Sequence, residues 1–176
     1  DLKSIGRKNL SKSSTYGTTT LEAKSGYGLS VDSEIKLLEV TKLLHGKNQN
    51  VMPTWLGAHD FPKDKTHSEY MEELIHEQLP FIAENKLSNW IDVFCEPGWF
   101  SLEQTELLVK SANEYGMKSR LHVDEFVDSG GLALAAELKS CSADHVGYSN
   151  LDSRDKAHNS GTMQVFLPGT PYVLGK

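Results

Sequence analysis

The sequence is poor in several features that define large protein classes. Its 176 residues include two cysteines, Cys95 and Cys141, which form no disulfide framework and lack zinc-site spacing, so a reduced, cytoplasmic setting is expected. No apolar run approaches the roughly 18 residues of a membrane helix, and no basic start leads into an apolar segment, so we expect neither a membrane span nor a signal peptide. Lys and Arg number 18 against 24 Asp and Glu, a net charge of −6 that argues against a nucleic-acid partner.

What the sequence does contain is typical of a globular domain. Hydrophobic residues make up 38% and glycines number 14, which excludes disordered, collagen-like and coiled-coil chains. The length suits one domain, or a large piece of one. Seven histidines are present, several of them at the ends of apolar runs.

Short β-rich runs alternate with helical runs along the whole chain. Strands are predicted at 15–24, 51–58, 90–95, 117–122, 143–148 and 162–167. Helices are predicted over the first dozen residues and at 32–45, 67–84, 101–115, 129–138 and 153–159. Pro80 is expected to kink the third of these, while Ser101 and Gln104 form a capping box that opens the fourth.

This alternation predicts an α/β fold with a parallel sheet, either a doubly wound open sheet or a (β/α)8 TIM barrel. The barrel is favoured because no glycine-rich phosphate loop follows the first strand and because titratable residues follow five consecutive strands, where a barrel collects them on one face. These residues are Glu22, Lys24, His59, Glu96, His122, Glu125 and His145. A complete barrel has about 250 residues, so residues 1–176 are expected to be an incomplete catalytic barrel domain of about six βα units.

The sharpest local pattern is His122 followed three residues later by Glu125. A histidine at a strand end can bind a metal ion, and a glutamate just beyond it can take a proton from the water that the metal activates. The spacing also occurs by chance, so a structural histidine is the alternative. His145 lies in an apolar strand and either pairs with a neighbour such as Asp144 or faces a polar pocket.

Four further strand-end groups carry open alternatives. His59 follows a strand end of small residues and either meets a ligand or lies on the surface. Tyr27, between two glycines, either projects into a pocket or packs over the rim. Glu22 and Lys24 share one side of a strand and favour an ion pair, and Glu96 either meets substrate or caps a loop. The remaining histidines, on helices, are predicted to be solvated or capping, and both cysteines are predicted to be buried and inert.

Six strings of residues, in order along nearly the whole chain, resemble the imidazolonepropionase family of the amidohydrolase superfamily. They are GTTTLEAKSGYGL (17–29), LGAH (56–59), DVFCEPGWFS (92–101), LHVDEF (121–126), GGLALAAEL (130–138) and SADHV (142–146). The resemblance implies a metal-bearing (β/α)8 barrel that hydrolyses the cyclic amide of 4-imidazolone-5-propanoate to N-formimidoyl-L-glutamate, a step of histidine degradation.

The resemblance also implies roles for individual residues. His122 would be a ligand of one divalent metal ion, zinc or iron, and Glu125 would be the acid/base that also contacts substrate. His145 would polarise the ring carbonyl, while Tyr27 and His59 would hold the substrate. The partner is then a small molecule, and the family's tendency toward homodimers carries over as an expectation.

Three family elements fall outside the matched strings: a His-x-His pair on the first barrel strand, an arginine just after it, and a metal-binding aspartate on the last strand. The resemblance therefore covers the central part of such an enzyme, and the chain expressed alone is expected to be inactive. Two alternatives stay open. One is a related amidohydrolase acting on another cyclic amide or a nucleobase, and the other is a barrel that binds a small acid without turnover.

Overall fold

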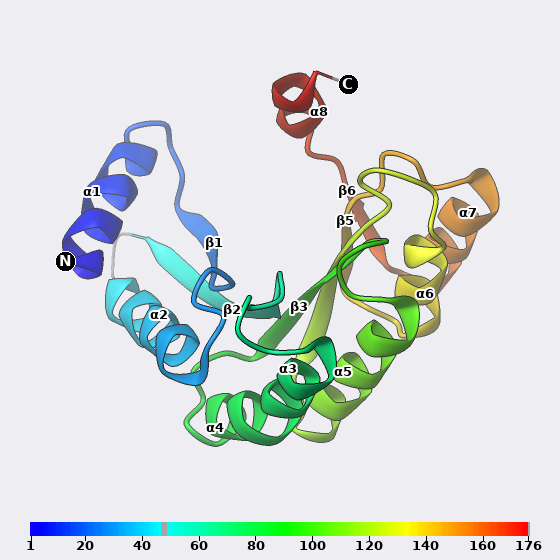
Figure 1. Ribbon diagram of the computed structural model, residues 1–176. Coiled ribbons are helices and arrows are strands. Elements are labelled where there is room, and N and C mark those ends of the chain that lie inside the picture. The colour runs from blue at the N-terminus through cyan, green and yellow to red at the C-terminus, as the bar shows by residue number, and fades with distance from the viewer. Residues whose placement is uncertain (47–48, 176) are drawn as a thin grey trace. The chain divides into compact units, whose positions relative to one another are not determined.

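Strands and helices alternate along the chain in the computed structural model, which describes residues 1–46 and 49–175 (Figure 1). Two compact units divide this part of the chain, Asp1–Ile91 and Asp92–Lys176. Each unit contributes parallel strands joined by helices, as the sequence predicts.

The first unit carries a pair of parallel strands. Its elements are α1 (Leu2–Ser14), β1 (Thr20–Lys24), α2 (Val31–Leu44), β2 (Asn50–Ala58), α3 (His67–Glu73), η1 (Leu74–Gln78) and α4 (Leu79–Glu84). In the register of the pair, Glu22 lies opposite Met52 and Lys24 opposite Thr54. Helix α2 packs beside β2, and its Leu38 is completely buried. The carboxyl ends of both strands therefore lie at the same edge of the pair.

The long helix predicted over 67–84 is divided into three segments. Thr66 and Glu69 form a capping box at the start of α3, and the π-helical turn η1 follows before α4 begins. Pro80 lies in the first turn of α4, where its missing N–H is tolerated. The predicted interruption is thus confirmed, and it takes the form of a wider helical turn just before the proline.

The second unit carries the remaining strands and helices. These are most of β3 (Trp90–Cys95), α5 (Leu102–Glu114), β4 (Lys118–Val123), α6 (Gly131–Glu137), β5 (Ser142–His145), α7 (Leu151–Ser160), β6 (Met163–Val165) and α8 (Gly169–Leu174). Strands β3 to β6 are hydrogen-bonded in chain order, and β4, β5 and β6 pair in parallel. The capping box of Ser101 and Gln104 opens α5 as predicted.

Several local expectations differ from the structure. The first strand begins at Thr20 instead of residue 15. The fifth strand ends at His145 instead of continuing to residue 148, because His145 and Val146 both have left-handed backbone conformations. Helix α8 follows Pro168, where the sequence predicts only a stop. Cys95 is buried, but Cys141 is exposed rather than buried.

The predicted fold class is confirmed: α/β, with about six βα units of the kind that build a (β/α)8 barrel. The described residues contain six strands, each followed by a helix, and every pairing whose direction is defined is parallel. None of the described helices combines the length and the apolar character needed to cross a membrane.

Candidate active site

The five predicted site residues fall into two groups. Tyr27 and His59 belong to the first unit, whereas His122, Glu125 and His145 belong to the second. Within each unit the structure brings the predicted residues into contact.

In the second unit, His122 lies between two carboxylates. It faces Asp144 across the β4–β5 register, and its ring Nδ1 lies 2.9 Å from Oδ1 of Asp92 on β3. Asp92 is completely buried and Asp144 nearly so. An ionised carboxylate can only accept, so with Asp92 ionised the hydrogen bond places a proton on Nδ1 of His122.

Glu125 and His145 form a pair beside His122. Oε2 of Glu125 lies 3.5 Å from Nε2 of His145, and their side chains are 11% and 10% exposed. The imidazole rings of His145 and His122 are 5.3 Å apart between centroids. A carboxylate and two imidazole rings are thus gathered within one site.

A cavity of about 300 Å³ opens beside this pair. Glu125, His145 and Tyr148 supply its polar side, and Phe166, Leu167 and Leu174 are among the apolar residues opposite. A small pocket with few polar groups on an apolar wall is the usual form of a small-molecule site. His145 therefore lines a mostly apolar cavity and has Glu125 as a partner, whereas the sequence suggested either a partner such as Asp144 or a polar pocket.

The turn that presents Glu125 is held by its neighbour Asp124. This aspartate is completely buried and has a φ of 51°. Its carboxylate accepts hydrogen bonds from Ser129, Gly131 and Leu132 at the start of α6 and from the Ser149 hydroxyl. The negative charge lies at the helix N-terminus, where it is favourable. Asp124 thus fixes the backbone on which Glu125 is mounted.

The turns after β4 and β5 are also joined through their backbones. The N–H of Val146 donates to the carbonyl of Val123 at 3.1 Å, and that of Tyr148 donates to Asp124 at 3.0 Å. Val146 has a φ of 48°, a costly conformation for a β-branched residue, and His145 has a φ of 74°. Such strained residues concentrate at functional sites, where the surrounding structure holds them in place.

Glu96 supports Glu125 from the end of β3. Its Oε1 accepts the backbone N–H of Glu125, which agrees with the loop-capping alternative. The carboxyl is 2% exposed, and among the described residues its Oε2 has no hydrogen-bond partner. The pKa of Glu96 is raised to about 7, chiefly by burial and also by the charges of Asp124 and Glu125, while the backbone hydrogen bonds from Glu125 and Phe126 act in the opposite direction.

This raised pKa predicts a pH dependence of stability. Between pH 4.5, the ordinary pKa of this carboxyl, and about 7, the folded state binds more protons at Glu96 than the unfolded state. Stability should therefore fall as the pH rises through this window. Urea unfolding measures the free energy of unfolding at each pH. Between pH 4.5 and about 7, this free energy should fall by about 1–3 kcal/mol less in Glu96→Gln than in the wild type. The exposed Glu114→Gln is the control, and parallel curves for Glu96→Gln and the wild type would contradict the expectation.

In the first unit, Tyr27 and His59 lie against each other. Their ring centroids are 4.7 Å apart and tilted by 56°, and Tyr27 is 82% exposed. Nearby, Nζ of Lys24 lies 3.5 Å from Glu22, which confirms the predicted ion pair. Tyr27 and His59 thus present a hydroxyl and an imidazole side by side.

The donor set of the second unit fits a divalent metal ion. Asp92, His122 and Asp144 each offer one ligand atom, and these atoms lie within 4.8 Å of one another. Two buried carboxylates beside an imidazole carry negative charge that a cation would compensate. Mixed nitrogen and oxygen ligands suit zinc and iron alike.

The roles of Asp92 and Asp124 were missed from the sequence. Asp92 interrupts an otherwise apolar strand, WIDVFC, and such a buried charge signals a partner because burying it alone is costly. Asp124 stands inside the LHVDEF string but was overlooked beside His122 and Glu125. Asp124 caps the start of α6, seven residues later in the chain. No local pattern in the sequence indicates this contact.

Three solved structures share the fold, each at low sequence identity. One is a Xaa-Pro dipeptidase with bound methionine in the active site, 17% identical, with a TM-score of 0.57 over 84% of this chain and 41% of its own. The second is an ochratoxinase from A. niger, 16% identical, with a TM-score of 0.55 over 89% and 43%. An uncharacterized protein, 13% identical, has a TM-score of 0.59 over 98% and 45%.

Sequence comparison gives a more specific likeness, although no protein-family model matches the chain. The imidazolonepropionase of Thermoanaerobacter pseudethanolicus is 39% identical over 172 residues, which cover 96% of this chain and 41% of the relative. That of Alkaliphilus oremlandii is 38% identical over 177 residues, covering 99% and 42%. The resemblance drawn from the six strings is thus confirmed: the chain is similar to imidazolonepropionases over nearly all of its length and spans about two fifths of the length of these curated relatives.

Proposed function

We propose that the protein to which this chain belongs hydrolyses the cyclic amide of 4-imidazolone-5-propanoate to N-formimidoyl-L-glutamate. The observation that carries the proposal is the contact of Glu125 with His145 beside His122, in a chain similar to imidazolonepropionases. Ring opening by water needs a group that moves protons and a donor facing the carbonyl oxygen. This pair supplies both.

In the proposed reaction Glu125 acts as the general base and then as the general acid. Its carboxylate takes a proton from the attacking water as the new C–O bond forms at the ring carbonyl. It then gives that proton to the ring nitrogen as the C–N bond breaks, so the amide is cleaved with net addition of one water. His145 donates a hydrogen bond to the carbonyl oxygen, where negative charge develops.

His122 is the residue of this chain that we propose as a metal ligand. A bound divalent ion would lower the pKa of a water molecule toward about 7. Of the three residues that each offer a ligand atom, Asp92 is proposed to have a different role: it accepts the Nδ1 proton of His122 and so orients that ring, the usual arrangement around metal-binding histidines. For the full-length protein, the proposal is that the ion is zinc or iron and that other residues complete its set of ligands.

Tyr27 and His59 are proposed to contact the substrate away from the reacting bond. The substrate is a flat ring that carries a carboxylate, and His59 is proposed to lie near that carboxylate. Tyr27 offers a hydroxyl on an exposed ring that already contacts His59. Both groups can hydrogen-bond to carboxylate oxygens, His59 as a donor through its ring N–H.

An assay of the full-length protein tests the proposal. Metal-loaded enzyme should consume 4-imidazolone-5-propanoate and release N-formimidoyl-L-glutamate, followed by loss of imidazolone absorbance and by mass spectrometry of the product. Dihydropyrimidines and nucleobases serve as competing substrates. Turnover of one of these alone would favour a related amidohydrolase, and tight binding of imidazolone propanoate without turnover would favour a non-catalytic barrel.

Removing the carboxylate of Asp92 should weaken metal binding. In Asp92→Ala the His122 ring loses the acceptor of its Nδ1 proton, so affinity for the metal should fall by about 10–100-fold. Equilibrium dialysis with Zn²⁺ measures this affinity directly. Asp92→Asn keeps the side-chain volume and one acceptor oxygen, so it should lose less. Equal affinities of the wild type and Asp92→Ala would show that Asp92 does not orient the ligand.

A further inference from the structure

Glu34 is a completely buried carboxylate in the first turn of α2, outside the site residues predicted from the sequence. Both of its oxygens point at the loop between β1 and α2. Oε2 accepts the N–H of Gly26 at 2.9 Å, and Oε1 accepts those of Gly28 at 2.7 Å and Leu29 at 3.3 Å. One carboxylate therefore accepts hydrogen bonds from backbone N–H groups on both sides of Tyr27.

This loop has little freedom to take another conformation. Gly26 has a φ of 110°, and a Cβ added there would come within 2.8 Å of the carbonyl oxygen of Leu56. A Cβ on Gly28 would lie 2.7 Å from that of Ser33. The loop is also attached to β2, because the Leu56 N–H donates to the Ser25 hydroxyl at 3.0 Å. The glycines are thus required for the close approach that lets Glu34 reach their N–H groups.

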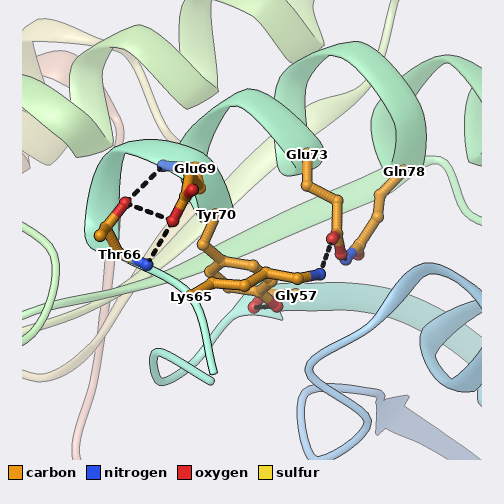
Figure 2. A network of polar contacts seen from close by, with 7 residues as sticks. All are labelled: Gly57, Lys65, Thr66, Glu69, Tyr70, Glu73 and Gln78. Carbon is orange, nitrogen blue, oxygen red and sulfur yellow. Dashed lines mark hydrogen bonds and ion pairs between the residues drawn. The ribbon is translucent and has the colours of Figure 1, made fainter. Parts of the chain in front are cut away.

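A polar network also fixes the end of β2, just before His59 (Figure 2). The Tyr70 hydroxyl donates to the carbonyl of Gly57 at 2.8 Å, two residues before His59. Lys65 pairs with Glu73, and Gln78 of the π-helical turn η1 donates to Glu73 at 2.9 Å. His59 is therefore mounted on a backbone that α3 and η1 hold in place.

Tyr27 differs from His59 in that packing does not hold its ring. The residue is 82% exposed, so its direction is set by the backbone of the loop. The ring nevertheless lies 4.7 Å from the His59 ring. The bonds that fix this backbone on both sides of Tyr27 include those from the N–H groups of Gly26 and Gly28 to Glu34.

We propose that Glu34 is a positioning residue that holds Tyr27 against His59, so that the two rings form a binding surface for a flat ligand bearing a carboxylate before that ligand arrives. The proposal rests on the substrate-binding roles proposed above for Tyr27 and His59. A carboxylate suits this task because its two oxygens can accept several N–H groups at once, and the N-terminus of α2 favours its charge. A surface formed in advance binds its ligand without the cost of ordering a loop.

The test uses Glu34→Ala in the full-length protein, with Leu38→Ala as the matched control. Leu38 is also completely buried on α2 but lies one turn beyond the carboxylate, so its loss weakens packing and leaves the loop bonds intact. In Glu34→Ala the KM for imidazolone propanoate should rise about 10-fold with kcat within about 2-fold, because binding and not chemistry is affected. Leu38→Ala should leave KM unchanged at a similar loss of thermal stability.

A spectroscopic measurement on the ligand-free protein separates this proposal from the proposed function. The ring current of Tyr27 should shift the His59 ring proton resonances, and Tyr27→Leu gives the reference without it. Glu34→Ala should move these resonances to the Tyr27→Leu positions and speed amide exchange at Gly28 about 100-fold. Glu34→Gln retains an acceptor oxygen and should keep most of the wild-type spectrum. If Glu34→Ala does not fold, Glu34→Asp replaces it in these measurements.

The proposal is overturned if the His59 resonances and KM are unchanged in Glu34→Ala. It is equally overturned if Leu38→Ala raises KM as much, because general destabilisation would then explain the effect. Should the wild type fail to turn over imidazolone propanoate, the proposed function is wrong, while the ring-current measurement still decides whether Glu34 positions Tyr27.

Discussion

Glu125→Gln in the full-length protein is expected to lower kcat by about 10²–10⁴-fold, the usual contribution of general acid–base catalysis. Glutamine has the size of glutamate but cannot take a proton from water or return one to a leaving nitrogen. The backbone N–H of Glu125 is held by Glu96, and this bond does not involve the substituted side chain. The loss should therefore fall on the chemical step while the fold is kept.

Three measurements make the interpretation of this variant specific. The melting temperature and the metal content should match those of the wild type, and KM should change little because the substituted group keeps its shape. Glu106→Gln is the matched control: it removes a carboxylate from an exposed position on α5, where Lys110 is its partner, and should leave kcat unchanged. Full activity in Glu125→Gln would refute the acid/base role.

Repeating local patterns made most of the fold predictable. The strand at 90–95 and the capping box of Ser101 and Gln104 were predicted at the positions that the structure shows, because both depend on residues within a few positions of one another. Five strands that carry a titratable residue at or near their carboxyl ends were predicted from the same short-range patterns. The end of β5 was predicted less well, since nothing in the residues after His145 signals a left-handed Val146.

The residues proposed for the candidate site could be chosen from the sequence, but the contacts between them could not. His122, Glu125 and His145 stand at strand ends, so the pattern that places the strands also places these residues. The contact of Asp92 with His122 joins residues 30 positions apart. Such a contact depends on strand order and register, which a single sequence leaves open.

Glu34 illustrates the same limit in the other unit. From the sequence it is one more acidic residue in the first turn of a helix, where a glutamate is common because of the helix dipole. Its function becomes visible only when the loop of Gly26 and Gly28 folds back over it. Sequence reasoning identified Tyr27 by its two flanking glycines but had no means to find the acceptor that requires them.

The second large effect is expected at His145. Loss of a hydrogen-bond donor to a developing oxyanion lowers kcat by about 10²–10³-fold. Asparagine also carries an N–H donor, but on a side chain shorter than histidine, so the same range is expected for His145→Asn and His145→Ala. The two variants should differ in stability. His145 has a φ of 74°, a conformation that asparagine adopts more readily than alanine, so the alanine variant pays an additional strain cost of about 1 kcal/mol.

This difference separates the catalytic part of the substitution from the structural part. Thermal unfolding of both variants should place His145→Asn near the wild type and His145→Ala below it, while steady-state kinetics should show nearly equal losses of kcat. If kcat instead followed stability, with His145→Asn close to the wild type in both, the imidazole ring would be dispensable and position 145 would serve to shape the turn between β5 and α7. Equal losses of kcat at unequal stability assign the effect to the ring that faces Glu125 and the cavity.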